Sequence, residues 1–201
     1  MNENIQLLDQ FNNPFVLFEK WFQEASNKEI NDPNAMNLST ISSDYKPNSR
    51  MVLLKGHDKD GFVFYSNTNS KKGKSISANP YVSLNFHWKS LLRQVRIEGK
   101  VCKVSDLEAD AYYNTRPKES RIGAWASKQS EELKNRKELE ESFEFYRNKF
   151  KDNNIKRPPH WTGFRVKPTL IEFWQDMPFR LHDRLEFKLI NNKWISKKLF
   201  P

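Results

Sequence analysis

The first regular pattern in the chain is an amphipathic helix near the N-terminus. Between Pro14 and Ala25, apolar side chains recur at helical spacing and would line one face of a helix. These side chains are Phe15, Phe18, Trp21, Phe22 and Ala25. Residues 27–33 are mostly polar and end in Pro33, which predicts a loop after the helix.

Short apolar segments, separated by Pro, Gly, Asn and Asp, predict strands along the rest of the chain. The predicted strands are 36–41, 49–55, 61–66, 81–88, 92–104, 163–166, 170–174, 185–190 and 194–199. Residues 55–61 predict a hairpin connection. Residues 105–150 are helical in pattern, with Ser105 and Glu108 as a capping box. This distribution predicts a mainly β fold, a closed antiparallel sheet with peripheral helices.

A length of 201 residues without a break in composition predicts one domain over 1–201, with residues 1–13 as a flexible N-terminal segment. No apolar run approaches the roughly 20 residues of a membrane span. The sequence from Met1 lacks the basic-then-apolar pattern of a secretory signal. The single cysteine, Cys102, excludes an internal disulfide framework. These features predict a soluble, cytoplasmic protein.

The chain is basic, with 34 Lys and Arg against 25 Asp and Glu and a net charge of +9. Such an excess favours an anionic partner, which would be nucleic acid, a membrane surface or a phosphorylated small molecule. A lysine-rich solvated surface gives the same balance. The positions of the basic residues therefore have to separate these alternatives.

Several familiar catalytic motifs are missing from the sequence. The histidines His57, His87, His160 and His182 include no pair at metal-ligand spacing. Cys102 lies in a predicted strand, where a lone cysteine is more often a packing residue than a nucleophile. The chain also has no P-loop, Rossmann or nucleophile-elbow motif.

Phosphate-binding groups gather among aromatic residues instead. Residues 65–72 end a predicted strand and open a predicted helix, where helix N–H groups, hydroxyls, Lys71 and Lys72 would bind a phosphate. The alternative is an ordinary polar turn. In residues 49–55, Arg50 and Lys55 flank an apolar run. Strand alternation puts these two cations on opposite faces, so either two sites flank the strand or a bulge intervenes.

Two further segments combine aromatic, cationic and hydrogen-bonding groups. Residues 112–120 contain Tyr112, Arg116 and Ser120, although an arginine at a helix end also suits the helix dipole. Residues 123–130 supply amide and hydroxyl groups that suit a heteroaromatic ring. Helix capping accounts equally well for the serines of that segment.

Residues 171–184 carry the densest group of candidates. If residues 180–184 are extended, Arg180, His182 and Arg184 share one face of a strand. On a half-buried face these groups would repel and lose hydration unless an anion or a ring compensates. Ion pairs with Glu172 and Asp183 are the structural alternative.

At these residues the sequence resembles the pyridoxamine 5'-phosphate oxidase family. Residues 172–184 resemble the family signature, in which an acidic residue, an aromatic residue and Trp-Gln precede a four-residue gap and Arg-Leu-His-Asp-Arg. Residues 50–55, 93–95, 116–117, 122–125 and 127–130 resemble further family blocks in family order. The resemblance covers residues 14–201.

The resemblance implies an FMN-binding split β-barrel that forms a homodimer, with FMN between the subunits. The implied FMN contacts are Arg50, Met51, Val52, Leu53, Leu54, Lys55, Tyr65, Ser66, Lys71, Lys72, Gln94, Gln129, Ser130, Trp174 and Arg184. The implied substrate contacts are Lys55, Tyr112, Arg116, Ser120, Arg180, Leu181 and His182, with Arg180 and His182 as catalytic residues. Two adjacent phosphate sites would explain why Arg50 and Lys55 face opposite ways.

The implied reaction is the FMN-dependent oxidation of pyridoxamine 5'-phosphate and pyridoxine 5'-phosphate by O2. The products would be pyridoxal 5'-phosphate, H2O2 and, from the amine, NH3, in vitamin B6 biosynthesis or salvage. Lys71 replaces a usual arginine of the family, Ser66 replaces a common threonine, and the segment before Pro14 is short. The alternatives are a split-barrel flavoprotein with another substrate and a basic nucleic-acid-binding module, whose affinity would fall with salt. No metal site, no nucleic-acid partner and no membrane partner are expected.

Overall fold

The computed structural model describes residues 11–151 and 154–201, so most of the predicted flexible segment 1–13 lies outside the described residues. The N-terminal helix, α2 (Pro14–Lys28), is confirmed. It begins where the Asn13 side chain accepts a hydrogen bond from the Phe15 amide and where Pro14 occupies the first turn. The other helices are α3 (Lys71–Ala78), α4 (Asp106–Thr115), α5 (Lys118–Ala126) and α6 (Arg136–Lys149), and short 3-10 turns lie at η1 (Lys89–Leu91) and η2 (Pro178–Arg180).

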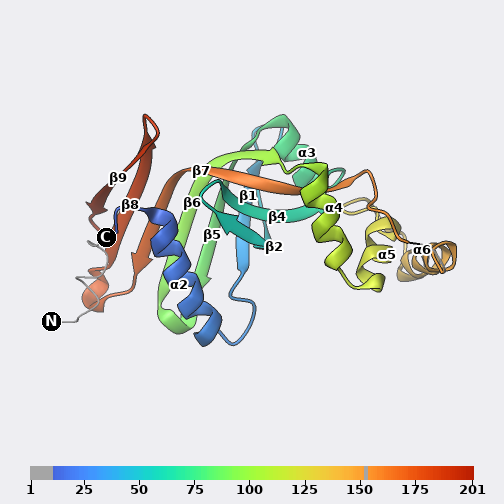
Figure 1. The fold of residues 1–201 in the computed structure, drawn as a ribbon, viewed down its shortest axis with the longest axis horizontal. Helices are drawn as coiled ribbons and strands as arrows, with labels where there is room; N and C mark the ends of the chain where they lie inside the picture. The colour runs from blue at the N-terminus through green and yellow to red at the C-terminus, as the bar shows by residue number, and fades with distance from the viewer. Residues whose placement is uncertain (1–10, 152–153) are drawn as a thin grey trace.

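The strands form one antiparallel sheet in the order β2-β1-β5-β6-β7-β4-β3, and β8 and β9 extend it from β7. Their bounds are β1 (Ala35–Ile41), β2 (Pro47–Leu53), β3 (Gly56–Asp58), β4 (Gly61–Asn67), β5 (Tyr81–Trp88), β6 (Arg93–Lys103), β7 (Trp161–Gln175), β8 (Asp183–Ile190) and β9 (Lys193–Leu199). The first half of β7 pairs with β4 and its second half with β8, while β6 pairs along both halves. Strand β7 therefore connects the two ends of the molecule (Figure 1).

The prediction of separate strands at 163–166 and 170–174 is wrong, because β7 is continuous through Pro168. The register of β6 against β7 shifts between Glu98 and Gly99, opposite this proline. A bulge tolerates proline, which has no N–H to donate to the ladder. A Cβ atom on Gly99 would lie 2.3 Å from the Lys167 carbonyl oxygen, so the close approach of the two backbones requires glycine.

The expectation of a closed sheet is also wrong, since β2 and β3 stand at the two ends of the hydrogen-bonded order. The chain passes from β2 to β3 through Leu54 and Lys55. The Leu54 amide donates to the Asn34 carbonyl and the Lys55 amide donates to the Val63 carbonyl, both over 2.8 Å. The barrel is therefore split, with these residues at its opening.

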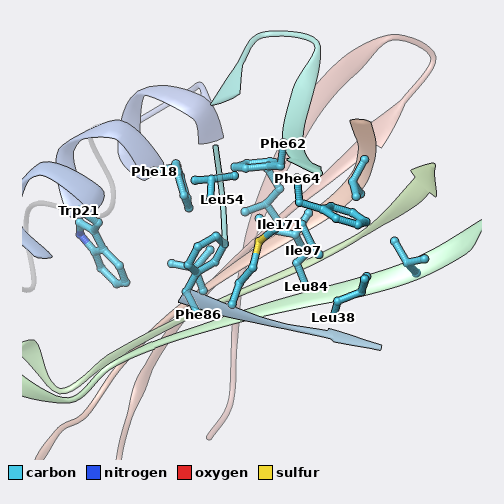
Figure 2. Close-up of a cluster of buried hydrophobic side chains, with 14 of the residues drawn as sticks. Phe18, Trp21, Leu38, Leu54, Phe62, Phe64, Leu84, Phe86, Ile97 and Ile171 are labelled. Carbon is cyan, nitrogen blue, oxygen red and sulfur yellow. The ribbon is translucent and has the colours of Figure 1, made fainter. Parts of the chain in front are cut away.

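Aromatic rings fill the space between α2 and the sheet (Figure 2). The Phe18 ring lies 4.8 Å from that of Phe62 and 5.3 Å from that of Phe86, in edge-on contacts. Trp21 meets Phe173 in the same way at 5.2 Å. Each buried ring of this kind contributes roughly 1.5–3 kcal/mol through removal from water, so the core fixes the half of the barrel that α2 covers.

The predicted helical region 105–150 consists of the three helices α4, α5 and α6. They lie at one end of the molecule, away from the β8–β9 hairpin (Figure 1). A second apolar cluster joins them to the start of β7, with Tyr113, Ile122, Ile155 and Trp161 as its buried members. In the described ranges no helix has the length and apolar character needed to cross a membrane.

Candidate active site

A cavity of about 700 Å³ lies where α4 and α5 meet β4 and the start of β7. It brings together predicted residues from four separate segments of the sequence. These predicted residues are Leu53, Lys55, Tyr65, Ser66, Tyr112, Arg116, Ser120 and Gln129. The same wall contains Asn67, Thr115, Pro117, Gly123, Ala124 and Ser127, which lie in the predicted segments but were not named as contacts, and Trp161, which the sequence patterns did not indicate.

A group of cations lies beside this cavity, next to Ser66 and Gln129. The Lys72 ammonium donates to Ser66 Oγ over 3.1 Å and to Gln129 Oε1 over 3.0 Å. Arg50 Nη1 donates to the Leu38 carbonyl and to Thr40 Oγ1, both over 2.9 Å. Side chains from β2, β4, α3 and the loop after α5 thus converge at one place.

The charges of these two cations are not compensated by carboxylates in the described part of the chain. Burial lowers the pKa of Arg50, and burial together with the nearby Arg50 charge lowers the pKa of Lys72. An anion between them would reverse both effects. Helix α3 begins at this point, with Ser70 as its N-cap and the predicted Lys71 exposed as its first residue.

Three nearly parallel aromatic rings form a wall of the cavity. The Tyr65 ring lies 3.9 Å from that of Tyr112 and 5.2 Å from that of Trp161. Burial, with smaller contributions from the Glu108 and Tyr112 charges, raises the pKa of Tyr65 to about 12. The Tyr65 hydroxyl is therefore a neutral phenol that can donate a hydrogen bond at any physiological pH.

Arg116 extends along this wall with its guanidinium carbon 4.9 Å from the Trp161 ring centroid. Its Nη1 is buried and has no hydrogen-bond partner in the structure. Burial also lowers the pKa of Arg116. A buried arginine nitrogen without a partner at a cavity wall is the donor that a phosphate or carboxylate of a ligand would use.

The two cations of the 49–55 segment do lie on opposite faces, as strand alternation predicted. Arg50 pairs with the buried Leu38 across β1 and points to the inner face, together with Val52. Met51 and Leu53 are on the outer face, and exposed Lys55 follows the strand and lines the cavity. Leu54 is buried in the core. The strand is therefore flanked by two different polar sites.

Three of the remaining predicted flavin contacts lie at the other end of β7 from this cavity, and the fourth, Ser130, follows Gln129. Gln94, Trp174 and Arg184 are directly paired neighbours on β6, β7 and β8. Trp174 is near the end of β7, whereas Trp161 is its first residue, and 13 steps of about 3.3 Å correspond to about 43 Å of strand. Ser130 is exposed in the loop after α5, with a positive φ of 75°.

The expectation that Arg180, His182 and Arg184 share one extended face is wrong. Pro178 starts a 3-10 turn in which Phe179 and Arg180 have φ of 60° and 62°, so β8 begins only at Asp183. Arg180 and Leu181 are exposed. His182 is half-buried, with Nδ1 2.9 Å from Asp176 Oδ1 and its ring 4.6 Å from that of Trp174. The proline and the two positive φ angles break the alternation that the expectation assumed.

A buried carboxylate, Glu172, explains how Arg184 is held. Glu172 is 3% exposed, and its Oε1 accepts from Arg184 Nε over 2.8 Å. Its Oε2 accepts from Arg96 Nη2 over 2.6 Å, and Arg184 Nη1 donates to the Phe200 carbonyl over 2.9 Å. The ion pair with Glu172 is therefore confirmed for Arg184, and Arg96 is a second partner that the sequence did not suggest.

The open antiparallel barrel, with a polar cavity beside strand β4, places the chain among the split-barrel proteins. The family described as pyridoxamine 5'-phosphate oxidase matches residues 22–150. A second description, the pyridoxine 5'-phosphate oxidase C-terminal dimerisation region, matches residues 161–201. The chain belongs to the pyridoxamine 5'-phosphate oxidase family and is an oxidoreductase, which confirms the resemblance seen in its sequence.

Curated relatives are similar in sequence along nearly the whole chain. A pyridoxine/pyridoxamine 5'-phosphate oxidase of Rhodopseudomonas palustris (strain HaA2) is 53% identical over 191 residues, covering 94% of this chain and 90% of the relative. One of Caulobacter vibrioides (strain NA1000 / CB15N) is 54% identical over 188 residues, covering 94% and 85%.

Solved structures support the fold prediction of an antiparallel split barrel. PhzG from Burkholderia lata 383, in complex with tetrahydrophenazine-1-carboxylic acid, has a TM-score of 0.91 at 27% identity and covers 96% of this chain and 95% of its own. A pyridoxamine 5'-phosphate oxidase-related, FMN binding protein from Nostoc punctiforme PCC 73102 has a TM-score of 0.75 at 15% identity and covers 94% of this chain and 98% of its own. At this identity the likeness supports the fold alone.

Proposed function

We propose that the protein oxidises pyridoxamine 5'-phosphate and pyridoxine 5'-phosphate with O2 to pyridoxal 5'-phosphate, releasing H2O2 and, from the amine, NH3. The observation that carries this proposal is the pair of cation sites at one cavity, one at Arg50 and Lys72 beside Ser66 and Gln129, and one at Arg116 against the Trp161 ring. Two phosphorylated ring compounds, a cofactor and a substrate, would each place a phosphate at one of these cation sites. The reaction would belong to vitamin B6 biosynthesis or salvage.

The donor set around Lys72 fits FMN. Arg50, Lys72 and the Ser66 hydroxyl offer two positive charges and an O–H group without a competing carboxylate, which is the chemistry that a phosphate monoester requires. Gln129 would add an amide group. When bound, FMN supplies the redox chemistry by accepting a hydride from the substrate and passing electrons to O2.

The residues of the cavity would bind and orient the substrate. Arg116, with Lys55 and Ser120 on the same wall, would anchor its phosphate through charged hydrogen bonds. The parallel rings of Tyr65 and Tyr112 would exclude water from one side of the pyridine ring. A second copy of the chain would supply Arg180, Leu181 and His182, with Arg180 and His182 orienting the ring and assisting proton transfer.

A homodimer is part of the proposal because one chain does not bring its predicted flavin contacts together. The clusters at the two ends of β7 are separated by more strand than any mononucleotide spans. A two-fold axis would place the Gln94, Trp174 and Arg184 cluster of one subunit against the Lys72 end of the other. The match of residues 161–201 to a dimerisation region supports this arrangement.

We further propose that the chain is one domain, because β7 pairs with β4, β6 and β8 and so connects both parts of the sheet. A cytoplasmic location stays a prediction.

The visible spectrum and a peroxide assay test this function. We expect a yellow protein that forms H2O2 with pyridoxamine 5'-phosphate and gains pyridoxal 5'-phosphate absorbance in equal amount. A flavoprotein that oxidises a tetrahydrophenazine carboxylate, but neither vitamin B6 phosphate, would support the alternative substrate that the PhzG likeness raises. A colourless protein with salt-sensitive affinity for nucleic acid would contradict both the oxidase function and the alternative flavoprotein function.

A further inference from the structure

Arg116 is held by aromatic rings and not by carboxylates. Its guanidinium carbon lies 4.9 Å from the Trp161 ring centroid and 5.8 Å from that of Tyr113. The groups that affect its charge in the described chain are tyrosines and burial, with no acidic side chain among them. The orientation of the guanidinium is therefore set while its positive charge stays uncompensated.

Trp161 is itself fixed from two directions. Arg157 Nη1 donates to the Trp161 carbonyl over 2.7 Å, and the same guanidinium forms ion pairs with Asp106 and Asp110 of α4. The residue Trp161 as a whole is 7% exposed. The first residue of β7 is thus tied to the helix whose C-cap is Arg116.

We propose that Trp161 is a positioning residue, which holds the Arg116 guanidinium in the direction of the substrate phosphate without reducing its charge. The inference depends on the proposed function, because it assumes a phosphorylated substrate. An indole ring attracts a cation through its quadrupole and carries no net charge. A carboxylate at the same place would orient Arg116 equally well but would cancel the charge and repel a phosphate. This difference explains why the cavity wall carries tryptophan there.

A double-mutant cycle tests this role in the FMN-loaded protein. Trp161→Leu removes the ring, Trp161→Phe keeps one, and each is made alone and with Arg116→Ala. The dissociation constants of pyridoxal 5'-phosphate and of pyridoxal are measured for each variant, with bound FMN as the check of the fold. We expect Trp161→Leu to weaken pyridoxal 5'-phosphate binding on the order of tenfold, with little effect on pyridoxal. Trp161→Phe should stay close to the wild type, and in the Arg116→Ala background the effect of Trp161→Leu should vanish.

Equal weakening of both ligands, or the same loss with Arg116→Ala present, would overturn the positioning role. If Trp161→Leu does not fold, Trp161→Met replaces it, and the Phe variant must then bind pyridoxal 5'-phosphate more tightly than the Met variant. Failure of the wild type to bind pyridoxal 5'-phosphate and to oxidise pyridoxamine 5'-phosphate is a different result, since it would remove the proposed function itself.

Discussion

Lys72 and Gln129 are 57 residues apart in the chain, and the Lys72 ammonium donates a hydrogen bond of 3.0 Å to the Gln129 amide oxygen. The Ser66 hydroxyl donates to the same oxygen over 3.3 Å and accepts from Lys72 over 3.1 Å. Within residues 11–151 and 154–201, the acceptors of the Lys72 ammonium are all neutral oxygens, so this cation is poorly compensated there. Its position is explained by a ligand that brings negative charge.

Lys72→Met should weaken FMN binding by a factor of about 10 to 100, because a hydrogen bond to a charged group contributes about 1.5–3 kcal/mol. The measurement is quenching of flavin fluorescence by the apoprotein. Lys74→Met is the matched control, since Lys74 is exposed on the same helix α3, and it should bind FMN like the wild type.

The same substitution should leave the apoprotein as stable as before or more stable. Burial lowers the pKa of Lys72, which means that the fold disfavours its charged form. Thermal unfolding of the apoprotein measures this. A clear fall in the melting temperature of Lys72→Met without flavin would contradict the view that Lys72 serves the ligand and not the fold.

Tyr65 gives a prediction for alkaline pH. Its pKa is raised from 10.0 to about 12, so between these values the unfolded chain loses the phenol proton while the folded protein keeps it. The folded state then binds more protons, and stability falls as pH rises from 10 to 12. Tyr65→Phe removes this group, so its stability should fall less steeply over that interval than that of the wild type. Urea unfolding at several pH values above 9 measures the two slopes, and parallel slopes would contradict the raised pKa.

Local patterns in the sequence predicted those parts of the site that depend on neighbouring residues. The helix that residues 65–72 were predicted to open and the opposite orientations of Arg50 and Lys55, which follow from the period of a strand, are both found. The continuity of β7 through Pro168 was missed, because it depends on a bulge in another strand at Gly99. Local periodicity contains no information about that partner.

Contacts between distant segments were the other part that the sequence did not reveal. Trp161 follows a proline-rich loop with no pattern of its own, and it becomes a cavity wall only because β7 packs beside α4. Arg96 reaches Glu172 only because β6 pairs with β7 in one register. The turn at Phe179 and Arg180 requires positive φ angles at non-glycine residues, which few sequence patterns predict.

Glu172→Gln should destabilise the protein by roughly 3 kcal/mol, because it removes the buried carboxylate charge that Arg96 and Arg184 share. Urea unfolding measures the change in the free energy of unfolding. The protein concentration is held fixed, since the stability of a dimer depends on it. The control is Glu98→Gln, whose carboxylate is 51% exposed and 3.8 Å from Arg96 and should contribute less than about 1 kcal/mol. Equal effects of both substitutions would show that Glu172 has no special role.

Arg116→Ala and Arg180→Ala should each lower kcat/KM on the order of 10- to 100-fold, since in the proposed function each arginine would donate a charged hydrogen bond to the substrate. The two arginines lie near opposite ends of β7, and the dimer proposal assigns them to one site from different subunits. When the two variants are mixed, refolded together and loaded with FMN, half of the dimers contain one copy of each. In every such mixed dimer, one site carries both substitutions and the other carries neither. The mixture should therefore recover about a quarter of the wild-type activity.

The matched control mixes Arg116→Ala with Ser120→Ala, two substitutions in the same cavity of one chain. Every site in that mixture lacks one of the two groups, so its activity should equal the mean of the two variants measured separately, with no recovery above that mean. The measurement is H2O2 formation with pyridoxamine 5'-phosphate, normalised to bound FMN. If the first mixture recovers no more than the second, Arg116 and Arg180 do not serve one site across two chains, and the arrangement of flavin contacts between subunits is wrong.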